Sequence, residues 1–77
     1  MAEHVMTIKK NSREEIRVGL DEFEGRPIFQ ARVYYDPGDG DMRPGKNGIG
    51  FKAELLADFA DGVSLALEKA RARGLVK

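Results

Sequence analysis

The chain has 77 residues, with 13 basic and 13 acidic side chains and no cysteine. This length leaves room for one domain, and the lack of cysteine excludes disulfides and thiolate metal sites as support for a small core. No apolar run approaches the ~20 residues of a membrane span, and the N-terminal residues lack an apolar signal segment, so we expect a cytoplasmic protein.

An N-terminal tail is predicted for residues 1–14, with a short extended piece at Val5–Ile8, and a single domain for residues 15–77. Alternating apolar residues from Ile16 predict a first strand that ends near Phe23, where Glu24-Gly25 forms a tight turn. The segment 28–35 is rich in β-branched and aromatic residues and is the strongest predicted strand. Its alternation divides the side chains between two faces: Gln30, Arg32 and Tyr34 on one, and Phe29, Ala31, Val33 and Tyr35 on the other.

Two short strands and a helix are predicted for the rest of the chain. Turn-forming residues at 36–40 and 44–48 separate strands at 41–43 and 49–52. Apolar residues then recur every three or four positions from Ala53 to Arg73, as in an amphipathic helix, and Gly74 is placed to end it. The expected fold class is therefore α+β: a curved, four-stranded antiparallel sheet followed by one helix. One helix covers one face of the sheet and leaves the other open.

The sequence offers little for catalysis. The only histidine, His4, lies in the predicted tail, and Ser12 and Ser64 have no base or oxyanion motif around them. The aspartates of the 36–41 turn lack the ligand order of a calcium loop, and the glycines at 45 and 48 lack the ending of a phosphate-binding loop. We expect no enzymatic activity, no cofactor and no metal.

The middle of the chain combines aromatic and basic residues on predicted strands. Residues 26–52 hold five basic and three acidic side chains. Single-stranded nucleic acids bind to surfaces on which bases stack against aromatic rings while cations contact the phosphates. Composition alone leaves a second interpretation open, in which the aromatic residues form the core and the cations form a solvated face.

A resemblance favours the first interpretation. Three motifs carry the resemblance: Phe-x-Gly-basic at 23–26, Arg-x-Tyr-aromatic at 32–35 and Gly-acid-Met-basic-Pro-Gly-basic-x-Gly-Ile at 40–49. The resemblance is to the C-terminal domain of the positive cofactor 4 transcriptional coactivator family, in a minimal, bacterial-type form. It covers roughly residues 16–73. The resemblance implies a homodimer that binds single-stranded DNA without strong sequence preference, in transcription regulation, replication or repair at the nucleoid. RNA stays open as a ligand, and transcription or repair proteins stay open as partners.

The resemblance also implies a set of DNA-binding residues. Phe23 and Tyr35 are expected to stack on bases. The expected phosphate or base contacts are Arg26, Arg32, Arg43 and Lys46, with Arg17 and Lys52 as additional candidates. Three positions that are often basic in the family are Asp21, Glu24 and Asn47 here, which weakens the electrostatic attraction for phosphates. The alternative function is therefore a protein-interaction module of the transcription machinery with weak or no nucleic-acid binding.

Overall fold

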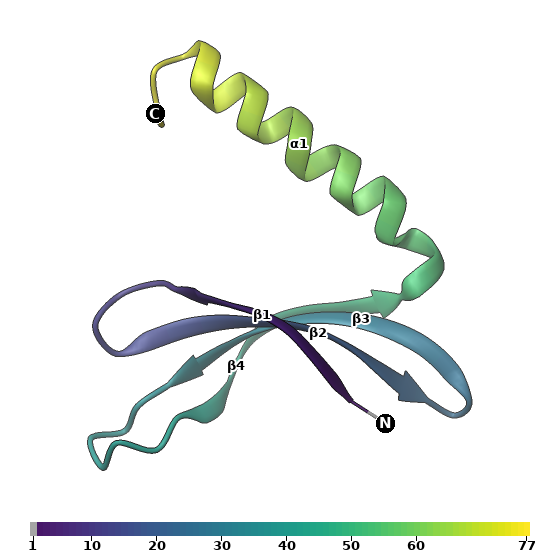
Figure 1. Cartoon of the computed structure of the whole chain (residues 1–77), viewed down its shortest axis with the longest axis vertical. Helices are drawn as coiled ribbons and strands as arrows, with labels where there is room; N and C mark the ends of the chain where they lie inside the picture. The colour runs from purple at the N-terminus through teal and green to yellow at the C-terminus, as the bar shows by residue number, and fades with distance from the viewer. Residues whose placement is uncertain (1) are drawn as a thin grey trace.

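The computed structural model describes residues 2–77 and shows one antiparallel sheet followed by one helix (Figure 1). The elements are β1 (Glu3–Lys9), β2 (Glu14–Phe23), β3 (Arg26–Tyr35), β4 (Arg43–Lys52), a short 3₁₀ turn (Ala53–Leu55) and α1 (Leu56–Ala72). The strand order in the sheet is β1-β2-β3-β4, a simple meander. The predicted α+β class, with four strands before a C-terminal helix, is confirmed.

The strand boundaries differ from the expectation at two places. Residues 3–9, expected in the tail, form β1 along β2, and the pairing skips Val5 between His4 and Met6. This bulge interrupts the alternation of side chains, so the sequence shows no strand period there. Arg43 and the segment 49–52, expected in two separate strands, belong to a single β4 that begins at Arg43, whereas residues 41 and 42 lie in the preceding loop.

A second bulge explains why β4 does not read as one strand. Arg32 pairs with Gly48 and Tyr34 with Pro44, so these pairs are two residues apart on β3 and four apart on β4. The Pro-Gly composition of the 44–48 segment predicts a turn, but in the structure this segment forms the bulge. Since β4 is a sheet edge, the missing N–H of Pro44 is tolerated.

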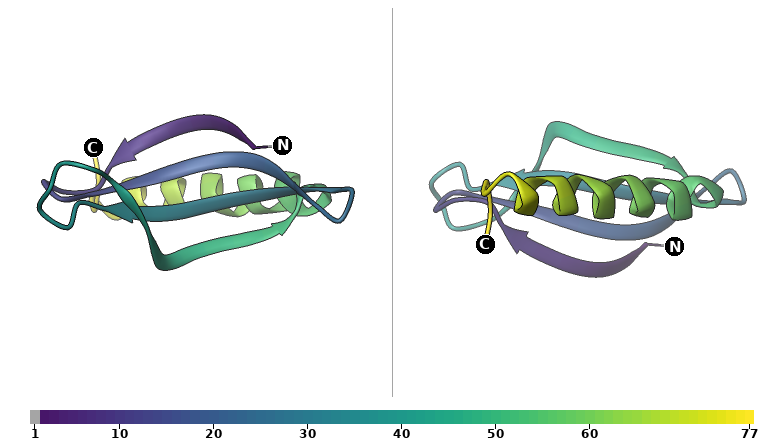
Figure 2. Two further views of the ribbon diagram at one scale, coloured as in Figure 1. Left: turned by 90° about the horizontal axis from the view of Figure 1, so that it is seen from below. Right: turned by 90° about the horizontal axis from the view of Figure 1, so that it is seen from above.

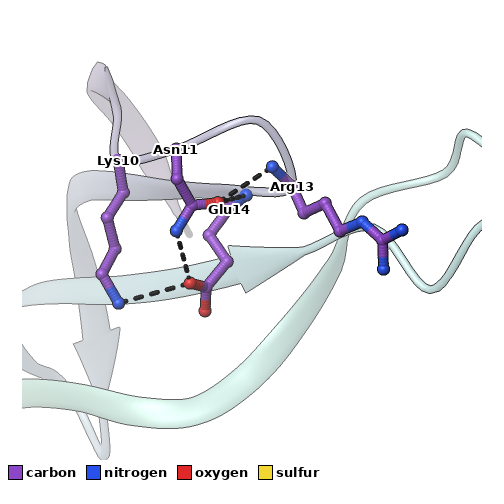
Figure 3. A network of polar contacts seen from close by, with 4 residues as sticks. All are labelled: Lys10, Asn11, Arg13 and Glu14. Atoms are coloured by element: carbon purple, nitrogen blue, oxygen red, sulfur yellow. Dashed lines mark hydrogen bonds and ion pairs between the residues drawn. The ribbon is translucent and has the colours of Figure 1, made fainter.

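The loop between β1 and β2 is closed by its own side chains (Figure 3). Asn11 Oδ1 accepts hydrogen bonds from the backbone N–H groups of Arg13 (2.9 Å) and Glu14 (2.8 Å). Asn11 Nδ2 donates to Glu14 Oε1 at 2.8 Å, and Lys10 Nζ lies 3.4 Å from the same oxygen. The Asn11 hydrogen bond and then the Lys10 charge hold the pKa of Glu14 below its ordinary value. This network fixes the turn that brings β1 back along β2.

Cross-strand pairs define two faces of the sheet, because directly paired residues of antiparallel strands point the same way. The first, which we call the helix face, carries apolar side chains from all four strands: Met6, Ile8, Ile16, Val18, Leu20, Phe29, Ala31, Val33, Ile49 and Phe51. The second, which we call the open face, carries mainly polar side chains, among them Arg17, Gln30, Arg32, Tyr34 and Lys52. The alternation predicted for residues 28–35 is thus the one observed.

Three phenylalanines join α1 to the helix face. The ring centroids of Phe29 and Phe51 are 5.1 Å apart, and Phe59 of α1 lies 6.0 Å from Phe29 and 5.1 Å from Phe51. Phe29, 8% exposed, is the one residue in 2–77 that is buried. Beyond Phe59 the helix runs back over the sheet at a widening distance (Figures 1 and 2). Its remaining apolar residues therefore gain no cover from the chain's own sheet.

The two ends of α1 differ in how they are made. At the C-terminal end Gly74 adopts φ 72°, its N–H donates to the Arg71 carbonyl (3.0 Å), and the Leu75 N–H donates to the Ala70 carbonyl (2.8 Å), which is a Schellman motif. At the N-terminal end no side chain caps the helix, and the 3₁₀ turn leads into it instead. Within residues 2–77, no helix has the length and apolar character needed to cross a membrane.

The aspartates of the β3–β4 loop shape that loop. Asp36 Oδ1 accepts the N–H groups of Gly38 (2.8 Å) and Gly40 (3.1 Å), and these two bonds lower the pKa of Asp36. Asp39 Oδ1 accepts the N–H of Asp41 at 2.9 Å. Across residues 2–77 no group of three His, Asp or Glu side chains is arranged to hold a metal ion.

Candidate nucleic-acid interface

Phe23 and Arg26 lie opposite each other at one end of the sheet. They form the last pair of the β2–β3 ladder, next to a turn in which Glu24 and Gly25 both adopt positive φ (52° and 77°). This turn matches the twist of the flanking strands. Phe23 is 64% exposed, which leaves its ring accessible for stacking. Lys52, one of the two additional candidates for DNA contact, lies at the same end of the sheet, where it lines a shallow hollow together with Arg26.

Arg32 and Arg17 lie opposite each other in the middle of the open face. The Arg17 guanidinium carbon lies 4.2 Å from the centroid of the Tyr34 ring, and Arg17 Nε lies 2.5 Å from Glu15 Oε2. Arg32 Nη1 donates to the Gly45 carbonyl at 3.2 Å. Both guanidinium groups are therefore held in place by neighbouring groups of the sheet.

Tyr35 and Arg43 form the pair at the opposite end of the sheet. The Tyr35 side chain is 40% exposed and lines a hollow together with Lys46, which lies in the β4 bulge. Arg43 Nη2 makes a 2.7 Å ion pair with Asp39 Oδ2, and both side chains are about half exposed. Any phosphate that binds Arg43 has to compete with this carboxylate.

The predicted residues therefore follow the length of the sheet and do not gather in one pocket. Arg26 and Tyr35 are nine residues apart on β3, or about 30 Å at ~3.3 Å per residue. Phe23, Arg26 and Arg32 belong to the open face by register, whereas Tyr35 belongs to the helix face. The bulge lies in β4, so the alternation within β3 is unbroken. One strand of nucleic acid reaches both ends only by following the sheet twist around an edge or by crossing to a second protomer.

Some residues around the site were not predicted as part of it. Glu15 and Asp39 hold two of the arginines, and Tyr34 supports Arg17. The alternation of residues 28–35 places Tyr34 on the same face as Arg32, so the sequence alone could have indicated that Tyr34 lies near the site. Glu15 and Arg17 lie two positions apart in β2, so the alternation also places these two side chains on one face. The ion pair of Arg43 with Asp39 left no such signal, because it depends on the conformation of the β3–β4 loop.

The geometry defines a class of protein: a strongly twisted four-stranded sheet with a single following helix and exposed aromatic–basic pairs at both ends. A crystal structure of BPSL1147, a PC4 homolog from Burkholderia pseudomallei, has this fold with a TM-score of 0.77 and 29% identity, over 86% of this chain and 97% of that one. The Transcriptional Coactivator p15 (PC4) family matches residues 10–62, more than half of the sequence. The chain belongs to this family.

Two further structures are similar. The MoSub1–DNA complex matches with a TM-score of 0.63 and 28% identity, over 90% of this chain and 84% of that one. A bacteriophage T5 homolog of the coactivator PC4, implicated in recombination-dependent DNA replication, matches with a TM-score of 0.56 at 20% identity, over 99% and 98% of the two chains, and shows the shared fold. No curated protein matches the sequence.

Proposed function

We propose that this protein is a homodimeric single-stranded DNA-binding protein that acts in transcription regulation or in DNA replication and repair, at the nucleoid. One observation carries the proposal. Each exposed aromatic ring at the two ends of the sheet has an arginine directly opposite it across the ladder, Arg26 beside Phe23 and Arg43 beside Tyr35. A base stacked on the ring then places its phosphate near a guanidinium. The complex of the related MoSub1 with DNA supports the same ligand.

Sequence tolerance follows from the chemistry of these groups. Every base has a flat face that stacks on an aromatic ring, and every nucleotide carries the same phosphate, so neither contact reads sequence. Preference for unpaired strands follows as well, because duplex bases are already stacked on each other. We expect a binding protein without a reaction of its own.

The homodimer is inferred from apolar surface that the chain leaves uncovered. Phe59, Val63 and Leu67 share one face of α1 and are 37%, 53% and 43% exposed, respectively. On the helix face of the sheet, Ile49 is 46% exposed. A 77-residue domain in which one residue of 2–77 is buried has too small a core of its own. A second copy offers the same apolar surfaces, as a two-fold interface requires.

Fluorescence anisotropy with a labelled oligothymidine of about twenty nucleotides tests the proposal, since single-strand sites span roughly 4–16 nucleotides per fold. We expect binding that exceeds that of the matching duplex and weakens with added salt. Equal affinity for single strand and duplex would contradict a site based on stacking. A complete lack of binding at low salt would instead favour the protein-interaction module, for which the carboxylates of Glu15 and Asp39, paired with Arg17 and Arg43, are the supporting observation.

Two substitutions separate stacking from charge. Tyr35→Ala is expected to weaken oligothymidine binding by about 1–3 kcal/mol with little change in salt dependence, because it removes a stacking surface and no charge. Arg43→Ala is expected to reduce the slope of log K against log salt by about 0.7, the value for one phosphate contact on a single strand. Titrations at four salt concentrations measure both quantities. Unchanged affinity in both variants would place the site elsewhere.

A further inference from the structure

A hollow of about 220 Å³ lies between the start of β1 and the open face, and its lining includes Glu3, His4, Arg17, Gln30, Arg32 and Tyr34. Arg17 and Arg32 are directly paired across β2 and β3. Like charges directly opposite each other destabilise a sheet, and the Glu15 carboxylate beside Arg17 offsets only part of that cost in the free protein. A negative group bound between the two guanidiniums would remove that cost.

The space around the two arginines is kept open by glycines. Gly19 pairs with Gln30, Gly48 pairs with Arg32, and Gly50 is the next open-face position on β4. A side chain at Gly48 would place its Cβ 2.9 Å from the Ala31 carbonyl oxygen and 3.2 Å from Arg32 Cα. The backbone packing thus requires glycine there, and the arginines have no bulky neighbour on that side.

Both guanidinium groups are positioned before any ligand arrives. Arg17 lies over the Tyr34 ring at 4.2 Å and pairs through Nε with Glu15, while Arg32 is held through Nη1 by the Gly45 carbonyl. A guanidinium has five N–H donors in a planar fork that matches phosphate oxygens, so one such bond leaves donors for an anion. Fixing these long side chains in advance lowers the entropic cost of binding. Two nearby carboxylates are already engaged, Glu15 with Arg17 and Asp21 with Gln30 Nε2 at 3.3 Å, while Glu3 also lines the hollow.

We propose that Arg17 and Arg32 together form one phosphate-binding site, with Tyr34 as the positioning residue beneath Arg17. Its ligand is a phosphodiester of the bound single strand, on the same face of the sheet as Phe23 and Arg26. The inference rests on the proposed function for the source of the phosphate, whereas the site itself would also accept free inorganic phosphate.

The salt dependence of oligothymidine binding tests whether the two arginines share one phosphate. Arg17→Gln and Arg32→Gln are each expected to weaken binding about five- to twenty-fold, and the double variant is expected to reduce the salt slope by about 0.7. Two separate phosphate contacts would reduce it by about 1.4, and that result would overturn the shared site. Arg13→Gln, in the β1–β2 loop and outside the hollow, is the matched control for the loss of one arginine and should change affinity less than two-fold.

A second measurement does not depend on DNA. The melting temperature of the wild-type protein and of Arg13→Gln should rise more in inorganic phosphate than in chloride of equal ionic strength, because a ligand of the folded state stabilises it. This difference should shrink in the Arg17→Gln and Arg32→Gln proteins, while the general effect of phosphate on protein hydration acts on all four. The same rise in all four would overturn the site. A selective rise without oligothymidine binding would uphold the site and reject the proposed function.

Discussion

Phe29→Ala is expected to lower the free energy of unfolding by about 3–5 kcal/mol, the usual cost of removing a buried phenylalanine ring. Phe29 is 8% exposed and contacts both Phe51 and Phe59, so its loss leaves a cavity at the junction of sheet and helix. A domain of 77 residues has about 4–12 kcal/mol of stability in total, at 0.05–0.15 kcal/mol per residue. The variant should therefore lose a large share of the stability of the protein.

Urea denaturation followed by circular dichroism, at one fixed protein concentration, measures this loss. Phe23→Ala is the matched control, because it removes the same ring from a position that is 64% exposed. We expect it to change stability by less than 1 kcal/mol. Equal losses in the two variants would mean that the phenylalanine cluster is not the core.

Val63→Asp is expected to convert the proposed dimer into a monomer. Val63 lies between Phe59 and Leu67 on one face of α1, since residues four apart share a helix face. Burying an unpaired carboxylate in an interface costs several kcal/mol, which weakens association by more than about a hundred-fold at 1.4 kcal/mol per factor of ten. Sedimentation equilibrium should then give the 8.6 kDa of one chain instead of twice that mass.

Leu65→Asp is the control for the interface. Leu65 is 56% exposed, close to the 53% of Val63, but lies two residues further along and so on the opposite side of the helix. Both substitutions place the same aspartate in the same helix, so any cost in helix propensity is shared. A dimer that survives Val63→Asp, or one lost equally in both variants, would exclude this helix face as the interface.

The sequence predicts the fold well where side chains alternate or repeat without interruption. The 28–35 segment forms β3 with its two faces as expected, and the repeat ending before Gly74 forms α1. It fails at the two bulges. One extra residue at Val5 shifts the alternation in β1, and the 44–48 segment, which holds two extra residues, has a Pro-Gly composition that predicts a turn.

The candidate site is less predictable than the fold. The motif identifies which residues are aromatic or basic, and the spacing places Arg32 and Tyr35 on opposite faces, as the register has them. The carboxylate beside Arg43 and the ring beneath Arg17 come from contacts across a loop and a ladder. Such contacts depend on tertiary positions that no local pattern encodes.

The two outer strands affect how far the protein can assemble. Both β1 and β4 are sheet edges, and an unprotected edge invites pairing with further chains into open-ended ribbons. β1 is bent by its bulge near Val5, while β4 combines a bulge with Pro44, which has no N–H to donate. These irregularities oppose strand-to-strand growth along either edge. In the proposed dimer, association is thereby left to the exposed face of α1, where a two-fold contact would cover that surface and assembly would stop at a pair.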